Sequence, residues 1–306
     1  MHNLTFRQLR AVSAVHRTGK IINAAKALGL TQPAVSLQLR DAELAAGVPL
    51  FDRTADGMRP TAAGLAVVDA AHAIDERLRL MTEEIDAIAS GRRGLLRLGV
   101  VSTAKYFAPA MMAAFMRNHP EIEMTLWVGN RAEAVDSLKA HRIDVALMGR
   151  PPNELPVRSA LFGEHPLVIV AAPDHPLAGA RRITKERVAK EHFLVREPGS
   201  GTRTSFDMFL SDLPGRVDNP GAEMGSNETI KQAVMAGLGI ALISAHTIAQ
   251  EVEAGRLAVL DVEGLPIRRQ WFSVSRADRS LTPVMAAFEE FLKQQGSRFL
   301  PDVLSR

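Results

Sequence analysis

Two short helical segments joined by a tight turn, between residues 20 and 43, constrain the fold of this chain more than any other stretch does. Apolar and small residues recur at helical spacing in the first segment: Ile21, Ala24, Ala25 and Leu28. Gly29 then marks a helix end, Thr31 can cap a second helix, and Pro33 falls in its first turn, where a missing N–H is harmless. The spacing predicts two helices packed closely through small side chains.

The second segment has two faces of different chemistry. The side that we expect to pack inward carries Val35, Leu39 and Ala42. The opposite side is short, polar and without acidic groups, and it carries Gln32, Pro33, Ser36 and Arg40. A helix-turn-helix needs this division, because its outer face must offer donors and acceptors to base edges in the major groove. A helical hairpin with a solvated polar face has the same spacing and is the alternative.

The residues around this pair complete a small domain. A first amphipathic helix is predicted to cover its apolar side through Leu4, Phe6, Leu9, Val12 and Val15. Further along, a short basic loop holds Arg53, Gly57 and Arg59. A loop of this kind after a recognition helix is typical of a wing, whose arginines lie along the DNA backbone or enter the minor groove. An ion pair between Arg53 and a nearby carboxylate is the alternative.

Positive charge is concentrated in the same segment. Residues 1–60 carry eight Lys or Arg and four Asp or Glu, a net charge of +4, whereas the remaining 246 residues carry about −1. A basic excess confined to the helical pair is suited to contact with phosphates. Chance asymmetry in a small segment is the alternative explanation.

Composition excludes several classes of protein. A hydrophobic content of 46% and a charged content of 23% in 306 residues are typical of a soluble globular protein with two or three domains. Without cysteine, the chain forms no disulfide and no thiolate metal site. Residues 1–10 contain no apolar signal region, and the longest nearly apolar run, 233–243, is too short to span a bilayer. We therefore expect a cytoplasmic protein without a membrane segment.

A heptad pattern follows the basic loop, in a helix predicted from Thr61 to Ser90. Its apolar residues are spaced alternately by four and three: Val67, Ala71, Ile74, Leu78, Met81, Ile85 and Ile88. A seam this narrow favours a partner helix, and a homodimer would hold two recognition helices about one DNA turn apart. The alternative is a helix packed on the remainder of its own chain. Residues 90–94, SGRRG, are the expected hinge.

From residue 95 onward, predicted strands and helices alternate. The strands are predicted at 95–101, 122–128, 142–148, 166–172, 192–197, 239–244 and 270–275. Helices are predicted near 104–118 and 131–140, and an amphipathic helix follows the last strand. This alternation indicates a parallel α/β architecture, in which ligands bind at the ends of strands.

Three stretches are candidates for a binding site in this α/β region, because each opens a helix with hydroxyl or amide side chains. They are Ser102 with Thr103; Ser200, Thr202 and Arg203; and Ser226, Asn227 and Thr229. Free N–H groups at a helix start, a hydroxyl and an arginine together make an anion site. Ordinary helix caps, and for Arg203 an ion pair with Glu197, are the alternatives.

The runs AAKALGLTQPAVSLQLRDAE, GVPLFDRT and GMRPTAAG together resemble the N-terminus of LysR-type transcriptional regulators. The resemblance implies that Gln32 and Pro33 contact bases. It also implies that Thr31, Ser36 and Arg40 contact backbone or bases, and that Arg53 is the wing arginine. Lys20 departs from the pattern, because the family usually has a helix-capping serine there; we expect a weaker cap and an added phosphate contact. Arg59 is placed in the same DNA-binding set.

The resemblance also implies an architecture for the whole chain. It comprises an all-α winged helix-turn-helix domain (1–60), a linker helix and hinge (61–91), and a C-terminal α/β effector-binding domain (92–306) like the periplasmic binding proteins. The effector domain would contain two Rossmann-like subdomains, one of about 92–164 with 269–306 and the other of about 165–268. The chain would cross between them near 163–166 and 265–270. Dimers of this family usually pair as tetramers, and they act on RNA polymerase at promoters.

Further stretches, among them REPGSGTR and VMAGLGIALISAHTIAQEVEAGRLAVLDVEGLPIRRQWF, look most like the CbbR-type members of this family. These activate operons of carbon dioxide fixation by the Calvin cycle, including the RuBisCO genes. The group senses phosphorylated metabolites or NADPH, so the resemblance implies a small anionic effector, with no cofactor or metal. A LysR-type regulator of another metabolic operon, with a different effector, is the closest alternative.

Two other classes of protein remain open. An enzyme with a DNA-binding segment would need a nucleophile, a metal set or a nucleotide loop, and the sequence contains no HExxH, GxSxG or Walker A pattern. We therefore predict that the protein is not an enzyme. An architectural DNA protein without a ligand would show no change of DNA binding with any metabolite.

Overall fold

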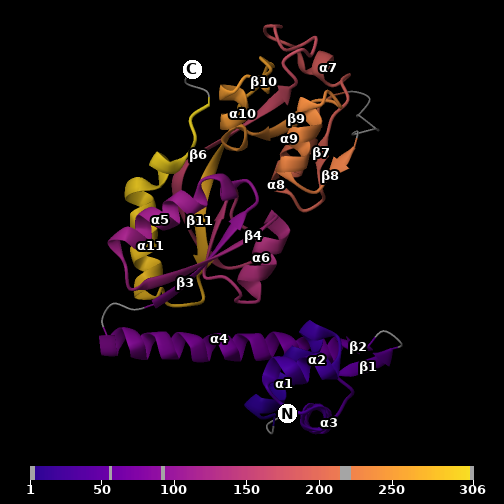
Figure 1. Cartoon of the computed structure of the whole chain (residues 1–306), viewed down its shortest axis with the longest axis vertical. Coiled ribbons are helices and arrows are strands. Elements are labelled where there is room, and N and C mark those ends of the chain that lie inside the picture. Colours follow the sequence, from indigo (N-terminus) through magenta and orange to yellow (C-terminus); the bar gives the residue numbers. More distant parts are fainter. Residues whose placement is uncertain (1–3, 55–56, 91–93, 214–221, 304–306) are drawn as a thin grey trace. The chain divides into compact units, whose positions relative to one another are not determined.

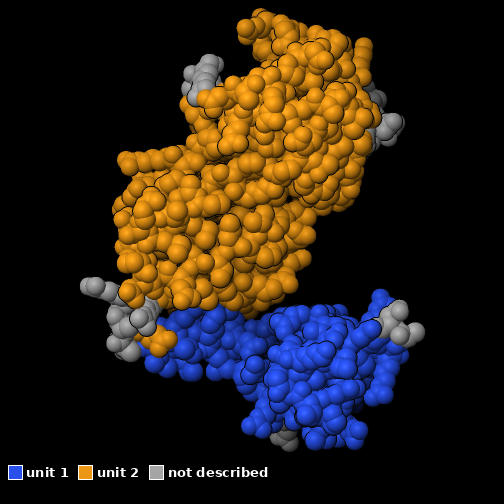
Figure 2. All heavy atoms as spheres, viewed as in Figure 1, with its two compact units in different colours: residues 1–85 blue, residues 86–306 orange. Residues whose placement is uncertain are grey.

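The computed structural model describes residues 4–54, 57–90, 94–213 and 222–303. The chain divides into two compact units, residues 1–85 and 86–306 (Figure 2). This division assigns most of the predicted linker helix to the first unit; the three-part division at residues 60 and 91 stays a prediction. The expected hinge, 90–94, falls largely outside the described residues.

The first unit is a helical domain with a two-stranded hairpin. Its elements are α1 (Phe6–Thr18), α2 (Ile21–Leu28), α3 (Gln32–Ala46), β1 (Phe51–Thr54), β2 (Gly57–Pro60) and α4 (Ala62–Ser90, which extends beyond the unit). Helices α1, α2 and α3 each end at a glycine with positive φ: Gly19, Gly29 and Gly47. The sequence therefore located the turn between α2 and α3 correctly.

One apolar core holds this unit together. It contains the predicted inward face of α3, where Val35, Leu39 and Ala42 are buried, and the two small residues of α2, Ala24 and Ala25. Helix α1 contributes Leu9, Val12 and Val15 as predicted, whereas Phe6 is 39% exposed. Small side chains at the contacts let the helices approach closely, as a helix-turn-helix requires.

The second unit is built on a seven-stranded sheet in the order β10-β6-β11-β5-β3-β4, with β9 also paired to β6. The strands are β3 (Gly94–Val101), β4 (Ile122–Gly129), β5 (Val145–Met148), β6 (Val157–Ala171), β9 (Ala241–Ser244), β10 (Ala258–Val259) and β11 (Ile267–Arg276). Two short strands, β7 (Val195–Arg196) and β8 (Glu223–Met224), pair separately.

The helices of this unit cover the sheet in two halves. The first half has η1 (Ala104–Tyr106), α5 (Ala108–Asn118), α6 (Arg131–Lys139), α11 (Pro283–Gln295) and η3 (Gly296–Phe299). The second has α7 (Lys185–Val188), α8 (Gly201–Phe209), α9 (Asn227–Met235), η2 (Ala245–Thr247) and α10 (Ala249–Glu253) (Figure 1). Each half has its own apolar clusters, as the predicted two-subdomain architecture requires.

Strands β6 and β11 are shared by the two halves. They pair antiparallel from Val157↔Arg276 to Leu167↔Ile267, and the far end of β6 then pairs with β9 and β10 (Figure 1). Beyond the shared ladder, alternate residues of β6 enter different cores: Leu167 and Ile169 face one cluster, Val168 and Val170 the other. The subdomain boundaries themselves stay a prediction.

The predicted α/β architecture is present, but its sheet is mixed instead of parallel throughout. Strand β3 is parallel to β4 and β5, but β11 is antiparallel to both β5 and β6, and β6 is antiparallel to β9. The reason lies in the connections between the halves. The chain leaves the first half along β6 and comes back along β11, so the two strands run in opposite directions. The strand predicted at 192–197 is also shorter than expected: Val195–Arg196 form β7, and Phe193 makes an isolated bridge with Ile240.

Among the described residues, no helix combines the length and the apolar character that crossing a membrane requires.

Candidate functional site

The polar face of α3 is presented to solvent as the sequence predicted. Gln32, Pro33 and Arg40 are exposed and Ser36 is half-buried. The first turn of α3 has no acidic residue, and the exposed Thr31 caps it by accepting a hydrogen bond from the N–H of Ala34 at 3.4 Å. A helix start with free N–H groups and an uncharged or cationic surface is suited to a polyanion.

Lys20 occupies the N-cap position of α2, where no side-chain hydrogen bond caps the helix. This agrees with the expected weakening of the cap. The lysine is exposed, and a long aliphatic chain at this position leaves its ammonium group free for solvent or phosphate.

The wing predicted from the basic loop is present as the β1–β2 hairpin. Arg53 pairs with Met58, and Asp52 pairs with Arg59. Because paired residues share a face and neighbours along a strand alternate, the two exposed arginines lie on opposite faces of the hairpin. A single DNA backbone strand therefore cannot contact both of them in the same way.

The hairpin is fixed to the helical turn through its backbone. The N–H of Met58 donates to the carbonyl of Gly19 at 2.8 Å. Gly57 has φ +142°, and a Cβ on it would lie 2.3 Å from that same carbonyl oxygen. Glycine is therefore required here for the wing to approach the turn between α1 and α2.

Helix α4 carries the heptad seam in two parts. Val67 and Ala71 are buried in the core of the first unit, whereas the next residues of the seam are 38–54% exposed: Ile74, Leu78, Met81 and Ile85. The side chain of Ile88 lies outside the described residues. Four large apolar side chains aligned on one exposed stripe are typical of a helix that pairs with another.

In the second unit, four of the predicted residues come together. Ser102 and Thr103 follow β3, Ser200 caps α8, and Thr202 lies in the first turn of α8; all four line one narrow slot. The slot also contains residues that the sequence analysis did not select: Val101, Asn130, Arg131, Gly149, His165, Gly201 and Arg269. Its volume of about 20 Å³ has room for about one water molecule.

The slot is narrow because the two halves touch around it. The N–H of Ala132, in α6, donates to the carbonyl of Gly199 at 3.3 Å, and Arg269 donates to the carbonyl of Gly201 at 3.0 Å. The starts of α6 and α8 therefore face the same space. Two helix N-termini converging on one slot favour an anion there.

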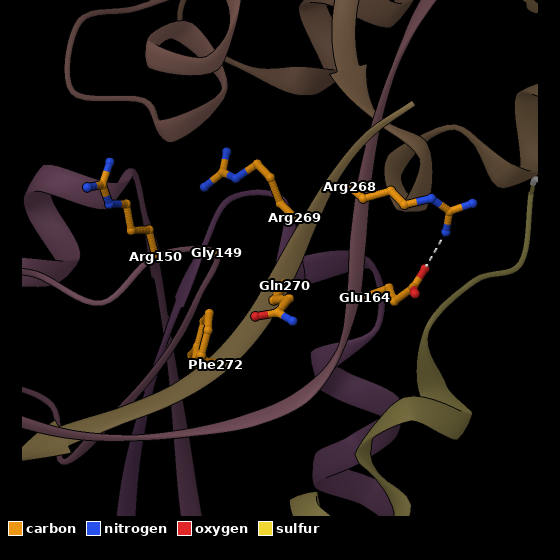
Figure 3. A pocket seen from close by; sticks show the side chains of 7 residues that line it. All are labelled: Gly149, Arg150, Glu164, Arg268, Arg269, Gln270 and Phe272. Atoms are coloured by element: carbon orange, nitrogen blue, oxygen red, sulfur yellow. Dashed lines mark hydrogen bonds and ion pairs between the residues drawn. The ribbon is translucent and has the colours of Figure 1, made fainter. Parts of the chain in front are cut away.

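Two wider cavities adjoin the slot through Arg269. One, of about 330 Å³, is lined by Gly149, Arg150, Glu164, Arg268, Arg269, Gln270 and Phe272 (Figure 3). The other, of about 500 Å³, has both charged and apolar walls: Arg131, Arg150, Asn153, Glu154, Gly201, Thr204, Ser205, Met208, Phe209, Ile267 and Arg269. The room for a metabolite therefore lies outside the slot, and a charged end group can point into it.

Four arginines line these two cavities: Arg131, Arg150, Arg268 and Arg269. Arg268 is turned toward Glu164, 3.1 Å away, but Arg150 and Arg269 extend into a common space (Figure 3). Burial lowers the pKa of Arg269, and the nearby charges of Arg131 and Arg150 lower it further. Within the described part of the chain, no ion pair joins Arg131, Arg150 or Arg269 to a carboxylate, although a backbone hydrogen bond and the charge of Arg131 lower the pKa of Glu154 in the same cavity wall. Three arginines against one carboxylate, Glu154, leave the larger cavity with an excess of positive charge that attracts an anion.

Arg203 was expected in this site, but the structure places it elsewhere. Its guanidinium contacts Asp207 at 3.1 Å and Glu223 at 3.5 Å, and it donates to the carbonyl of Arg196. It does not line the slot or the two adjoining cavities. The alternative of a local ion pair is therefore the better description, although its partners are not the expected Glu197.

The third predicted group also lies outside the cavities, because Ser226, Asn227 and Thr229 form the capped start of α9. Ser226 accepts from the N–H of Thr229 at 3.0 Å. Asn227 is fully buried and accepts a hydrogen bond from Arg196, which also donates to Ser102 at 3.0 Å. Arg196 therefore joins the second half to the end of β3 in the first.

A second polar connection between the halves lies beside it. Glu228 in α9 accepts hydrogen bonds from Lys105 and Tyr106 in η1. Burial raises the pKa of Glu228, but these two hydrogen bonds outweigh that effect and hold it below its ordinary value. Burial and the neighbouring carboxylate raise the pKa of Tyr106, so it stays a neutral donor. These contacts connect α9 of the second half to η1 of the first.

Two arginines of the site that were not predicted could have been found from the sequence. Arg131 and Arg150 closely follow β4 and β5, at the same sheet edge as Ser102, so the rule that selected Ser102 also applies to them. Arg269 and His165 had no such signal, because they lie within the shared strands and face each other across the ladder.

Comparison with known proteins gives a consistent assignment. Residues 6–65 match the family described as "Bacterial regulatory helix-turn-helix protein, lysR family", and residues 89–297 match "LysR substrate binding domain". The chain is 59% identical over 303 residues to the HTH-type transcriptional regulator CbbR of Rhizobium meliloti (strain 1021), covering 99% of this chain and 97% of the relative. It is 44% identical to the RuBisCO operon transcriptional regulator of Allochromatium vinosum, covering 97% and 98%.

Solved structures agree with this fold. The regulatory domain of Synechocystis PCC6803 CcmR, in complex with 2-PG (2-phosphoglycolate), is 35% identical with a TM-score of 0.61, covering 66% of this chain and 97% of that one. Full-length CbnR complexed with its target DNA has a TM-score of 0.68 at 21% identity, covering 95% and 99%. At that identity the likeness concerns the fold alone.

Proposed function

Because the chain belongs to the LysR family of transcriptional regulators, we propose that it controls the RuBisCO operon of its own organism in response to an anionic metabolite. A relative named for this function, the RuBisCO operon transcriptional regulator, matches almost the full length of the chain. The observation that carries the effector part of the proposal is the excess of positive charge beside the slot, where Arg131, Arg150 and Arg269 share a cavity with one carboxylate, Glu154.

The DNA contacts follow from the exposed surface of the first unit. Gln32, Pro33 and Ser36 would meet base edges from the start of α3, with Thr31 and Arg40 contacting bases or backbone. Lys20, Arg53 and Arg59 would bind phosphates, the last two from opposite faces of the wing. Regulation takes place in the cytoplasm, at a promoter where RNA polymerase is the further partner.

A homodimer is the minimal assembly for this function. The exposed stripe on α4 would pair with the same stripe of a second copy, and two recognition helices would then read two half-sites. Family resemblance extends this to a tetramer of two dimers.

The effector proposed here is a phosphorylated small molecule, and 2-phosphoglycolate is the first probe because the CcmR regulatory domain is described in complex with it. Its phosphate would lie beside Arg269 in the adjoining cavities, with one oxygen directed toward the hydroxyls of Ser102, Thr103 and Thr202 in the slot. NADPH is a further candidate, since the cavity of about 500 Å³ has apolar as well as basic walls. The cleft would bind its ligand without converting it.

Fluorescence anisotropy tests both parts with the full chain. The fragment upstream of the RuBisCO genes is compared with a coding fragment of equal length, without ligand, with 2-phosphoglycolate, and with glycolate, which lacks the phosphate. We expect preference for the upstream fragment and a change of affinity with the phosphorylated compound alone. Preference for the promoter of another operon would favour the alternative regulator, and no preference for any genomic fragment would refute sequence-specific regulation.

A further inference from the structure

His165 presents two unsatisfied ring nitrogens to the slot. It is 3% exposed, it lines the slot, and neither Nδ1 nor Nε2 has a hydrogen-bond partner within the described part of the chain. A buried polar group without a partner costs free energy, because it has lost its bonds to water. This residue therefore has hydrogen-bonding capacity that no described protein group uses.

Packing does not require those nitrogens. The His165 ring is stacked on Trp271 with centroids 3.9 Å apart and planes inclined by 14°. An apolar side chain could fill the same space against the indole without leaving polar atoms unpaired. The neighbouring His246 shows the contrast, since its Nδ1 accepts a hydrogen bond from the Trp271 indole N–H at 3.0 Å.

The surroundings of His165 determine its charge. Burial lowers its pKa well below the ordinary value, and Arg269 and His246 lower it further. The imidazole is therefore neutral at physiological pH, with one N–H donor and one acceptor. An added positive charge beside Arg269, Arg131 and Arg150 would be repelled.

His165 and Arg269 face the same point of the slot. They are paired residues on the adjacent strands β6 and β11, so both side chains leave the same face of the ladder. A Cβ on Gly149 would lie 2.9 Å from Nδ1 of His165 and 2.6 Å from Nη2 of Arg269. The absence of a side chain at Gly149 therefore leaves the space beside both nitrogen atoms unfilled.

We propose that His165 is a ligand-binding residue of the cleft, whose neutral imidazole donates a hydrogen bond to the oxyanion group that Arg269 also binds. This rests on the proposed function, because it assumes that an anionic ligand enters the cleft. The ligand then satisfies a donor that the unliganded domain leaves unpaired. Since both residues belong to the two strands shared by the halves, the ligand would bind directly to the elements that connect the halves.

Two substitutions of nearly equal shape provide the test: His165→Leu and His165→Asn in the full chain. Affinity for 2-phosphoglycolate and for inorganic phosphate is measured by calorimetry, and thermal stability is measured without ligand. We expect the leucine variant to bind about 10- to 100-fold more weakly than wild type, and the asparagine variant to stay within about threefold. Without ligand, we expect the leucine variant to have the higher Tm of the two, because leucine leaves no buried amide group unpaired.

A variant at Phe162, which stacks on Trp271 without lining the slot, serves as the packing control. Phe162→Leu should lower the Tm and leave affinity within about twofold. Equal affinities of the leucine and asparagine variants at position 165, or a loss of affinity that follows the loss of Tm in all three variants, would overturn the assignment of His165. No binding of either probe to the wild-type protein would instead refute the anion-binding cleft itself.

Discussion

At the scale of single residues, a substitution at Gln32 distinguishes base recognition from the attraction to phosphates. Gln32→Ala should weaken binding to the specific site by about 10-fold, because a good side-chain-to-base pair contributes about 1–3 kcal/mol of discrimination. Binding to random DNA should stay within about twofold. Competition anisotropy with specific and random duplexes measures both affinities. An equal loss on the two duplexes would exclude Gln32 from base readout.

Lys20→Ala is the matched variant for that comparison. A phosphate contact is independent of sequence, so binding should weaken on both duplexes to the same extent. The slope of log K against log salt should become shallower by about one. A loss confined to the specific duplex would show that Lys20 has a different role.

Two arginines that the sequence does not distinguish have different surroundings. Arg269→Met removes from the slot a guanidinium that forms no ion pair with a described carboxylate, and we expect about a 10- to 100-fold loss of affinity for 2-phosphoglycolate. Arg203→Met breaks only contacts with Asp207, Glu223 and a carbonyl, so affinity should stay within about twofold. Calorimetry on both variants checks this; a larger effect at Arg203 would restore it to the site.

The buried His246 makes the stability of the fold depend on pH. Burial lowers its pKa to about 4, and the hydrogen bond from Trp271 needs the Nδ1 lone pair. Because the unfolded chain binds this proton near pH 6.5 and the folded chain only near pH 4, stability is fully present above pH 6.5 and is lost as the pH falls. By pH 4 the loss from this residue is about 3 kcal/mol.

Urea unfolding at pH 7 and pH 4 measures this effect. His246→Gln keeps an acceptor for the indole but removes the titration, so its free energy of unfolding should fall less than that of wild type. An identical fall in the two proteins would show that other groups dominate acid unfolding.

At the scale of elements, α4 illustrates how one helix serves two purposes. Its first turns complete the core of the DNA-binding unit through Val67 and Ala71, and the following turns leave the same seam exposed. A sequence with a continuous heptad does not reveal this change, since spacing repeats whether or not the chain's own core covers it. The exposed part is the part available to a partner.

The double substitution Leu78→Asp and Ile85→Asp tests that surface. Both side chains are exposed, so the monomer fold should be retained, whereas two buried charges per helix would prevent pairing. Analytical ultracentrifugation should show a monomer, and affinity for the two-half-site operator should fall at least 10-fold. Ala73→Asp, at an exposed position on the side of the helix away from the stripe, is the control and should leave the assembly unchanged. A dimer that survives the double substitution would locate the interface elsewhere.

At the scale of the whole molecule, regulation is a coupling between DNA and ligand. If 2-phosphoglycolate changes operator affinity by a given factor, the operator must change 2-phosphoglycolate affinity by the same factor. Titrating the ligand into the protein with and without operator DNA measures the second factor, and operator titrations with and without ligand measure the first. We expect agreement within experimental error, with a coupling of about 5- to 150-fold. Unequal factors would indicate a change of assembly during one of the titrations.

The sequence by itself determined the local elements and the chemistry of exposed faces. Gly29, Thr31 and Pro33 specify where helices stop and start, and the inward face of α3 follows from helical periodicity, because these effects act within a few residues. The group of Ser102, Thr103, Ser200 and Thr202 was predictable for the same reason, since each lies at a strand end or a helix start.

Only the tertiary structure decided which charges have partners and which strands the halves share. Arg203 and Arg269 are the same type of residue, and their local sequences do not distinguish them. In the structure, Arg203 contacts two carboxylates, whereas Arg269 lies near other arginines. In the sequence, His165 is distinguished only by the proline that follows it. Its role depends on Arg269, which lies more than 100 positions away in β11. Pairing, burial and charge compensation are long-range properties, and one-dimensional spacing carries no information about them.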